Sequence, residues 1–290
     1  MGPLTGTPAS PVLIDRRAVA DLIAPLTELV ALAGSAILKV DRRGMRIDGK
    51  ADGSPTTEAD LAADRIIAEG LHRLAPDIPA LSEERVTRAG ASCPELFFLI
   101  DPLDGTKEFV AGRDEFTVNL ALVANGTPLL GIIGAPALGL IWRGLVGQGA
   151  ERLAAHRGIG HEVGLAQPIR TRPFPPLGKP RIAAVSRSHG DAATEAFIDA
   201  RPGAIRQRLG SAIKLAKVAE GVVDIYPRLA PTSEWDIAAG HAIVTAAGGK
   251  VTDAAGGDLR YGQGSRIGAK DFIVPAFIAW GDTGASQSSE

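Results

Sequence analysis

Residues 99–109 constrain the fold most, because here an apolar run ends in two aspartates that flank a proline and a leucine. The run at 96–100 is typical of a buried strand. Asp101 and Asp104 should project from its carboxyl end, with Pro102 stiffening the turn between them. Two carboxylates on a rigid corner are half of a divalent metal site, so the chain must fold to bring further ligands to this edge.

Further acids are predicted to reach the same edge from distant parts of the chain. Glu83 follows a short apolar strand at 78–81, and Asp236 lies in the first turn of a helix predicted at 234–247. Small residues after Asp236 allow that helix to pack closely against another element. Gly105 and Thr106 open a short helix whose free N–H groups face any phosphate held by the metals.

The ligand types indicate the metal. Carboxylates without accompanying thiol or imidazole ligands suit Mg²⁺ or Mn²⁺ and not zinc. Taken singly, each acid has a simpler interpretation: Asp104 in a turn, Glu83 in a solvated loop and Asp236 as a helix N-cap. Taken together, the acids favour the metal site.

Three motifs occur in the order and at the spacing of a known family. They are Ser-Glu-Glu at 82–84, Asp-Pro-Leu-Asp-Gly-Thr at 101–106 and Trp-Asp-Ile-Ala-Ala-Gly at 235–240. On these motifs the chain resembles the inositol monophosphatase superfamily of lithium-sensitive, magnesium-dependent phosphatases. Further stretches resemble its bacterial 3'(2'),5'-bisphosphate nucleotidase branch, called CysQ; they lie at 50–60, 103–109, 115–119, 185–189 and 218–221.

The resemblance implies a metal-ligand set. Its side-chain ligands are Glu83, Asp101, Asp104 and Asp236, and the backbone carbonyl of Leu103 is a further ligand. The implied cofactor is Mg²⁺, as two or three ions, with Mn²⁺ as a substitute and with Li⁺ and Ca²⁺ as inhibitors.

The resemblance also implies catalytic roles. The hydroxyl of Thr106, oriented by Asp60, would help to polarise the attacking water, and Glu83 would act as ligand and weak base. The residues expected against the cleaved phosphate are Asp104, Gly105, Thr106 and Asp236.

A basic and polar set in the second half is a candidate for substrate recognition. Ser211 and Lys214 are three apart on one face of a helix predicted at 211–220, and Gly210 before them would let a phosphate approach the backbone. The resemblance places Ser211, Lys214, His189 and Arg228 around a nucleotide, with Lys214 and Arg228 on its second phosphate.

Some of these residues have a second interpretation without the resemblance. His189 is then a solvated loop histidine and Arg228 a charge at the rim. Lys107 and Glu108 either belong to the nucleotidase version of the acidic motif or face solvent on the short helix.

Composition excludes several functional classes. With 290 residues, 45% hydrophobic and 4% aromatic, the chain can bury a large aliphatic core. Its 31 basic and 33 acidic residues give a net charge of −2, which provides no broad basic surface for a nucleic acid polymer. A phosphonucleotide-sized ligand needs only a local basic patch.

The remaining sequence signals concern location and redox chemistry. The single cysteine, Cys93, is expected to be structural or incidental. No apolar run reaches ~18 residues and no basic-then-apolar leader begins the chain, so we expect no transmembrane segment and a cytoplasmic protein. Peripheral association with the inner membrane stays open, as does the choice between monomer and homodimer.

The expected fold class is α/β (α+β), and the resemblance implies a layered α/β/α/β/α sandwich. Tails at 1–11 and 281–290 should be mobile, and a Pro- and Arg-rich linker at 167–180 should separate an N-terminal half at 12–166 from a C-terminal half at 181–280. Helices are predicted at 17–40, 58–74 and 191–200, a hairpin around Asn125-Gly126, and a loop at 41–55 carrying Lys50, Asp52 and Gly53.

The sequence therefore predicts a Mg²⁺-dependent nucleotidase that converts adenosine 3',5'-bisphosphate to AMP and phosphate in sulfur assimilation. The sulfated analogue of that nucleotide is a further candidate substrate. One alternative is an inositol monophosphatase, which shares the metal site. An alternative of another class is a catalytically silent phosphonucleotide sensor.

Overall fold

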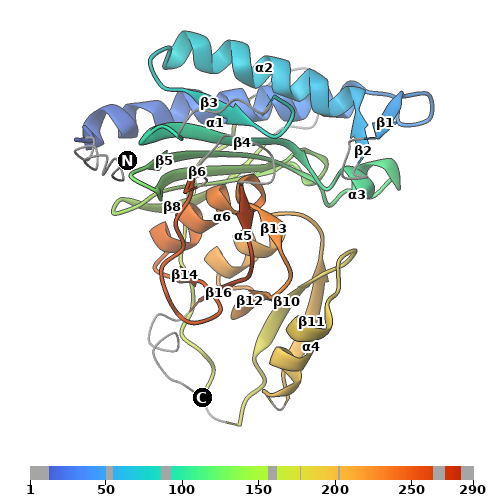
Figure 1. Ribbon diagram of the computed structural model, residues 1–290, viewed down its shortest axis with the longest axis vertical. Helices are drawn as coiled ribbons and strands as arrows, with labels where there is room; N and C mark the ends of the chain where they lie inside the picture. Colours follow the sequence, from blue (N-terminus) through green and yellow to red (C-terminus); the bar gives the residue numbers. More distant parts are fainter. Residues whose placement is uncertain are drawn as a thin grey trace, which may run out of the picture.

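The protein is a five-layered α/β/α/β/α sandwich, as predicted (Figure 1). The computed structural model describes residues 13–49, 55–85, 93–155, 162–176, 178–201, 203–263 and 272–281. From one side to the other, the layers are helices α1 and α2, a seven-stranded sheet, helices α5 and α6, a five-stranded sheet, and helix α4.

The seven-stranded sheet has the order β3-β4-β5-β6-β7-β8-β9, with β3 and β4 parallel and the other neighbours antiparallel. Its strands are β3 (Ala80–Ser82), β4 (Leu96–Asp104), β5 (Thr117–Ala124), β6 (Thr127–Ala135), β7 (Leu140–Leu145), β8 (Gly149–Ala154) and β9 (Gln167–Ile169). A single 3₁₀ turn, Pro136–Leu138, joins β6 to β7.

The central strands are apolar on both faces because both faces are covered. Phe97 and Leu99 of β4 belong to the core shared with α5 and α6, whereas Phe98 and Ile100 belong to the core under α1 and α2. Alternate side chains point to opposite faces of a strand, so the continuous apolar run that predicts β4 supplies both cores.

Two long helices cover the outer face of this sheet, α1 (Arg16–Lys39) and α2 (Glu58–Leu74). Length and composition alone would allow α1 to span a membrane, which the sequence analysis did not flag. In the structure α1 packs along α2 and β6, and it buries Leu26, Val30 and Ile37 completely. The helix therefore belongs to the core of this domain.

The hairpin predicted around Asn125-Gly126 is present. Strands β5 and β6 pair antiparallel, and Asn125 and Gly126 have φ of 50° and 74°. Two successive positive φ values give the turn that matches the twist of a two-residue hairpin, and Asn-Gly tolerates them best.

The five-stranded sheet forms the core of the second half, in the order β11-β10-β12-β16-β14. Its strands are β10 (Ile182–Ser186), β11 (Ile205–Leu209), β12 (Ile225–Arg228), β14 (Lys250–Thr252) and β16 (Phe277–Trp280). The helices of this half are α4 (Ala192–Asp199), α5 (Ile213–Ala219) and α6 (Glu234–Ala246). Two short pairs complete the described strands: β1 (Ile47–Gly49) with β2 (Pro55–Thr57), and β13 (Thr232–Ser233) with β15 (Ile273–Val274).

Helix α6 lies between the two sheets at unusually close range, because glycines face it on one side and it presents a glycine on the other. A Cβ added to Gly131 of β6 would lie 2.0 Å from the carbonyl oxygen of Ala239, and one added to Gly240 would lie 2.3 Å from Leu215. The small residues after Asp236 therefore do allow the close packing predicted for them.

Gly131→Ala should destabilise the protein by about 1–3 kcal/mol or more, because the carbonyl of Ala239 leaves no room for a methyl group. Thermal unfolding measures the loss. Gly44→Ala is the matched control, since nothing lies within 4 Å of its Cβ position. An unchanged melting temperature in Gly131→Ala would contradict the tight fit of α6.

The boundary between the halves differs from the prediction. The segment at 167–180 is not all linker, because Gln167–Ile169 forms the edge strand β9 and pairs with β8. Pro168 and the shortness of the strand hid it from sequence analysis. The tail at 1–11, residues 282–290 of the second tail, and Lys50, Asp52 and Gly53 lie outside the described residues.

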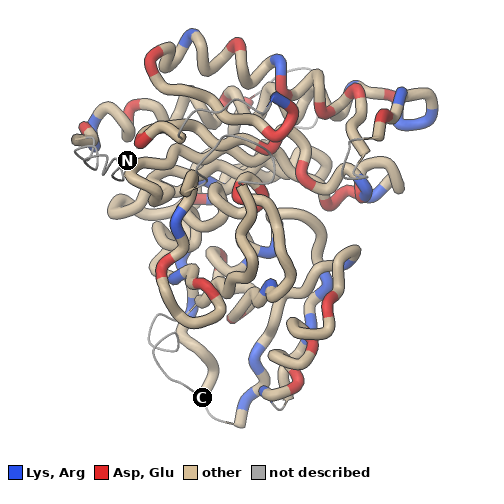
Figure 2. The backbone as a smooth tube through the Cα atoms, in the orientation of Figure 1, with Lys and Arg blue, Asp and Glu red and all other residues tan. Residues whose placement is uncertain are grey.

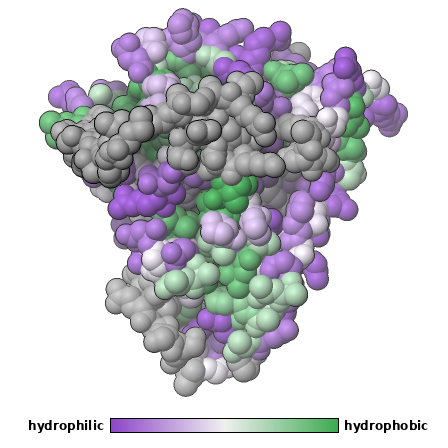
Figure 3. Space-filling model, in the orientation of Figure 1, coloured by the Kyte–Doolittle hydropathy of each residue, from purple (hydrophilic) through white to green (hydrophobic). Residues whose placement is uncertain are grey.

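Charges of both signs alternate along the chain, as Figure 2 shows, in keeping with the net charge of −2. In the space-filling view the visible surface over α2 is mainly hydrophilic, so the apolar face of that layer is turned inward (Figure 3).

Cys93 is half-buried, and burial together with the nearby charge of Glu234 raises its pKa to about 12. It is therefore not a reactive thiolate, in agreement with the sequence analysis.

Candidate active site

Three aspartates meet where the two halves join. Among the described residues, Asp101 and Asp104 of β4 and Asp236 of α6 each offer a carboxylate oxygen within 4.8 Å of the others. The sequence analysis ends the strand before Asp101, whereas β4 continues to Asp104. Its pairing with β5 is irregular between the two aspartates. Residues three apart on a regular strand face opposite sides, so this irregularity is what turns both carboxylates to one side.

Asp236 is fixed by the N-terminus of its own helix. Its Oδ2 accepts hydrogen bonds from the hydroxyl of Thr232 at 2.5 Å and from the backbone N–H of Ser233 at 3.2 Å. The N-cap of α6 is Ser233, and Asp236 is the third residue of the helix, where it completes a capping box. The N-cap interpretation of Asp236 is therefore wrong, whereas a ligand role is compatible with the capping box, because Oδ1 makes neither of these hydrogen bonds.

The chemistry of this group fits a divalent cation. Burial, followed by the charge of Asp104, raises the pKa of Asp236 to about 6. Carboxylates held this close repel one another, and a hard cation bound between them removes the repulsion and uses their oxygens as ligands.

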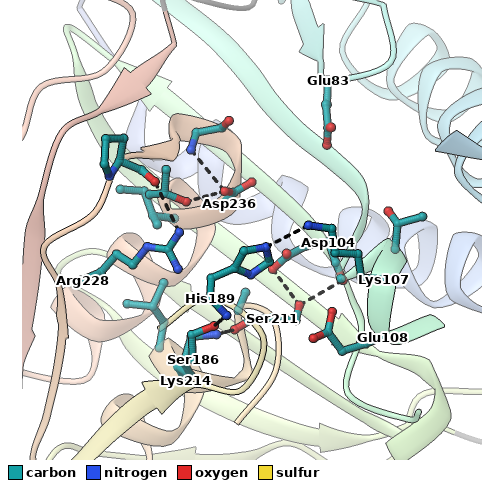
Figure 4. Close-up of a pocket in the computed structure, with 18 of the residues that line it drawn as sticks. Glu83, Asp104, Lys107, Glu108, Ser186, His189, Ser211, Lys214, Arg228 and Asp236 are labelled. Carbon is teal, nitrogen blue, oxygen red and sulfur yellow. Dashed lines mark hydrogen bonds between the residues drawn. The ribbon is translucent and has the colours of Figure 1, made fainter. Parts of the chain in front are cut away.

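Glu83 stands apart from the three aspartates, whereas Leu103 lies between two of them and donates its N–H to Asp101 at 3.0 Å. Glu83 lies just after β3, its N–H donates to the carbonyl of Ile100 at 3.1 Å, and its carboxylate points toward the acidic group (Figure 4). It lines the same cavity but does not belong to the 4.8 Å cluster. Leu103 buries its side chain under α1 and α2, and its carbonyl lies 3.1 Å from the hydroxyl of Thr106.

Thr106 and Asp60 are brought together across 46 positions. The Thr106 hydroxyl lies 3.1 Å from Oδ1 of Asp60, whose Oδ2 accepts from the N–H and the hydroxyl of Thr57 at 2.7 and 2.6 Å. Asp60 is thus held by the capping box of α2 and in turn orients Thr106. Gly105, with φ of 90°, turns the chain from β4 into the short helix α3 (Thr106–Val110).

A cavity of about 350 Å³ lies between the acidic group and the second half. The predicted recognition residues other than Gly210 also line it: His189, Ser211, Lys214 and Arg228 (Figure 4). The cavity therefore brings basic residues close to the acids. We call the aspartates with Glu83 the acidic wall, and Lys214, Arg228 and His189 the basic wall.

The cations of this wall have distinct environments. Lys214 is fully buried, which lowers its pKa to about 8, and its ammonium group donates to the carbonyl of Ser211 at 2.5 Å. Arg228 donates to the carbonyls of Ala230 and Pro231. Burial, then the charges of Lys107 and Arg228, lower the pKa of His189, so this imidazole is neutral near pH 7.

Ser211 and Gly210 differ from their predictions. Ser211 precedes α5 and has φ of 51°, so it does not share a helix face with Lys214. This left-handed backbone lets its hydroxyl donate to Oδ2 of Asp104 at 2.7 Å. Gly210 donates its N–H to Glu115, whose backbone oxygen would be 2.7 Å from a Cβ at this position. The space beside Gly210 is filled by Glu115 and not open to a phosphate.

Several residues of the cavity were missed from sequence. Thr232 holds Asp236, and Ser186, Tyr226 and Ile273 also line the cavity. The sequence carried a signal for Ser233 but not for Thr232, since a capping box has its hydroxyl residue three positions before the helix-start acid and Thr232 lies four before it. Ile273 gave no signal, because an isolated isoleucine is far more often core.

Comparison with known proteins agrees with this geometry. A family model described as the inositol monophosphatase family matches residues 19–280. A 3'(2'),5'-bisphosphate nucleotidase CysQ of Shigella flexneri is 38% identical over 253 residues, covering 86% of this chain and 96% of that protein. The chain belongs to the inositol monophosphatase family.

Solved structures share the fold. CysQ from Bacteroides thetaiotaomicron, described as a bacterial member of the inositol monophosphatase family, superposes with a TM-score of 0.71 at 34% identity, covering 89% of this chain and 96% of that one. The inositol monophosphatase from Anabaena gives 0.68 at 25% identity, covering 91% and 92%. The predicted family and five-layer fold are thus confirmed.

Proposed function

We propose that this protein is a Mg²⁺-dependent 3'(2'),5'-bisphosphate nucleotidase that hydrolyses adenosine 3',5'-bisphosphate to AMP and phosphate. The observation that carries the proposal is a cavity lined by Asp104 and Asp236 of the aspartate cluster and, close to them, by Lys214 and Arg228. Such a cavity suits a small substrate with one phosphate to be cleaved and another to be held. The names of the CysQ relatives support the same substrate class.

The acidic wall performs the hydrolysis in this proposal. Asp101, Asp104 and Asp236, with Glu83 and the Leu103 carbonyl, would hold the Mg²⁺ ions. Bound divalent ions lower the pKa of water and neutralise phosphoryl oxygens in an in-line displacement.

The residues behind the acids orient the reactants. Thr106, fixed by Asp60, would position the attacking water, and Glu83 would serve as a weak base. The backbone N–H groups of Gly105 and Thr106 would bind oxygens of the cleaved phosphate.

The basic wall holds the phosphate that is not cleaved. Lys214 and Arg228 supply the charge, while neutral His189 supplies a hydrogen bond. A phosphosulfate nucleotide carries the same second anionic group and would be accepted for the same reason.

Phosphate release from a panel of substrates tests the proposal. Adenosine 3',5'-bisphosphate should have a higher kcat/KM than inositol monophosphates or fructose bisphosphate. A preference for an inositol phosphate would make the protein an inositol monophosphatase. Binding without turnover of any of these compounds would make it a phosphonucleotide sensor.

Activity should depend on the metal in a specific way. Chelation should abolish turnover, Mg²⁺ should restore it and Mn²⁺ should substitute. Ca²⁺ should inhibit, because its longer bonds and looser geometry misplace the reacting groups. Li⁺ at submillimolar to millimolar concentration should inhibit by displacing a weakly held Mg²⁺. Phosphate release measures each effect, and full activity with Ca²⁺ alone would contradict this account.

A further inference from the structure

Three consecutive residues of the second half are each held by a side chain of the first half. Arg187, Ser188 and His189 form the loop after β10, and their partners are Glu115, Glu108 and Lys107, respectively. We call these three pairs the interdomain clamp. They join residues 72 to 82 positions apart, so they form only when the halves come together.

The first pair is a bidentate ion pair. Arg187 donates from Nε and Nη2 to the two oxygens of Glu115 at 2.8 and 3.0 Å. Burial alone would raise the pKa of Glu115, but the hydrogen bond and the charge of Arg187 lower it below its usual value. Glu115 also accepts the N–H of Gly210 at 2.9 Å, so the same carboxylate fixes the loop that carries Ser211.

The second and third pairs come from α3. Glu108 is almost completely buried and accepts the hydroxyl of Ser188. The ammonium group of Lys107 lies 3.3 Å from Nε2 of His189. An ammonium group can only donate, so Nε2 accepts and the histidine carries its proton on Nδ1.

We propose that Lys107, Glu108 and Glu115 are positioning residues for the nucleotide, because they hold the loop that places His189 against it. This inference rests on the proposed function and assigns a role to two side chains of the acidic motif that the metal site leaves unused. It also predicts where the specificity lies: the clamp orders the wall that meets the second phosphate, and it is linked to the acidic group through Ser211, which follows Gly210 and donates to Asp104.

Arg187→Gln tests the clamp, because it removes the ion pair and leaves Glu115 to accept the N–H of Gly210. KM for adenosine 3',5'-bisphosphate and the Kd of its product AMP, measured by calorimetry with Mg²⁺, should both rise about tenfold, because a smaller fraction of molecules has the loop in place. The kcat should stay within about twofold, and the affinity for Mg²⁺ should not change. Glu108→Gln should act in the same direction.

Glu195→Gln is the matched control, since it breaks an ion pair of the same length, 2.8 Å to Arg206, within the second half. It should leave KM and Kd unchanged. The double variant Glu115→Gln with Arg187→Gln should lose less than the sum of the two single variants, because both remove the ion pair that they share.

The outcomes separate the two proposals. Unchanged KM and Kd in Arg187→Gln, with a wild type that hydrolyses the bisphosphate, would overturn the clamp alone. A weaker Mg²⁺ affinity in this variant would also overturn it, because the residue would then serve the metal site. A wild type that neither hydrolyses the bisphosphate nor binds AMP would overturn the proposed function and the ligand assigned to the clamp.

Discussion

Asp104→Asn should lower kcat by roughly three powers of ten or more while the protein stays folded. Asp104 lies at the centre of the site: its carboxylate belongs to the acidic cluster, its charge acts on Asp236, and its Oδ2 accepts the hydroxyl of Ser211. An amide is nearly isosteric but neutral, so it weakens cation binding without removing volume. Phosphate release at saturating and limiting Mg²⁺ measures the loss, and circular dichroism checks the fold.

Asp21→Asn is the control for this experiment, because it makes the same chemical change on the exposed surface of α1. It should have wild-type turnover. Near-normal turnover of Asp104→Asn at limiting Mg²⁺ would remove Asp104 from the metal site.

The second large effect concerns the basic wall. Lys214→Met and Arg228→Met should each reduce kcat/KM for adenosine 3',5'-bisphosphate by about one to two powers of ten, since a charge-assisted contact is worth roughly 1.5–3 kcal/mol. Turnover of an inositol monophosphate, which lacks the second phosphate, should change little. Methionine keeps the apolar stem that Lys214 buries, so the loss reports the charge and not the packing.

The pH dependence provides an independent check on Lys214. Its pKa of about 8 means that the ammonium form, which binds phosphate, is lost as pH rises through 8. The wild-type KM for the bisphosphate should therefore rise above pH 8, and this rise should be absent in Lys214→Met. Equal losses on both substrates would instead mean that Lys214 and Arg228 serve the fold or the metal site.

The local sequence pattern predicted the bounds of those helices and strands that long-range contacts leave undistorted. Helix α2 has the predicted bounds because the Thr57–Asp60 capping box starts it and Pro76 follows it closely. The start of α5 was predicted two residues early, because Ser211 adopts a left-handed backbone to reach Asp104. That contact joins positions 107 apart, and no local rule reports it.

The candidate site was likewise predicted only in part from the sequence. The acids were found because strand ends and helix starts are readable in sequence. The role of Gly210 was predicted wrongly, because the residue that fills the space beside it, Glu115, lies 95 positions away. The pairs of the interdomain clamp could not be predicted for the same reason, although all three stretches that contain them resemble the nucleotidase branch.

The position of α6 has a consequence for how the protein is made. A ribosome that has released residues up to Ile169 has completed the seven-stranded sheet, yet the face of that sheet that α5 and α6 cover is still bare. Trp142 and Leu99 on this face then lack their packing partners, which include Trp235. Trp235 is synthesised more than sixty residues after Ile169. We therefore expect a stage of synthesis in which this apolar face is exposed, which favours aggregation. The same late segment delivers Asp236, so under the proposed function a chain without it would lack a metal ligand and would be inactive.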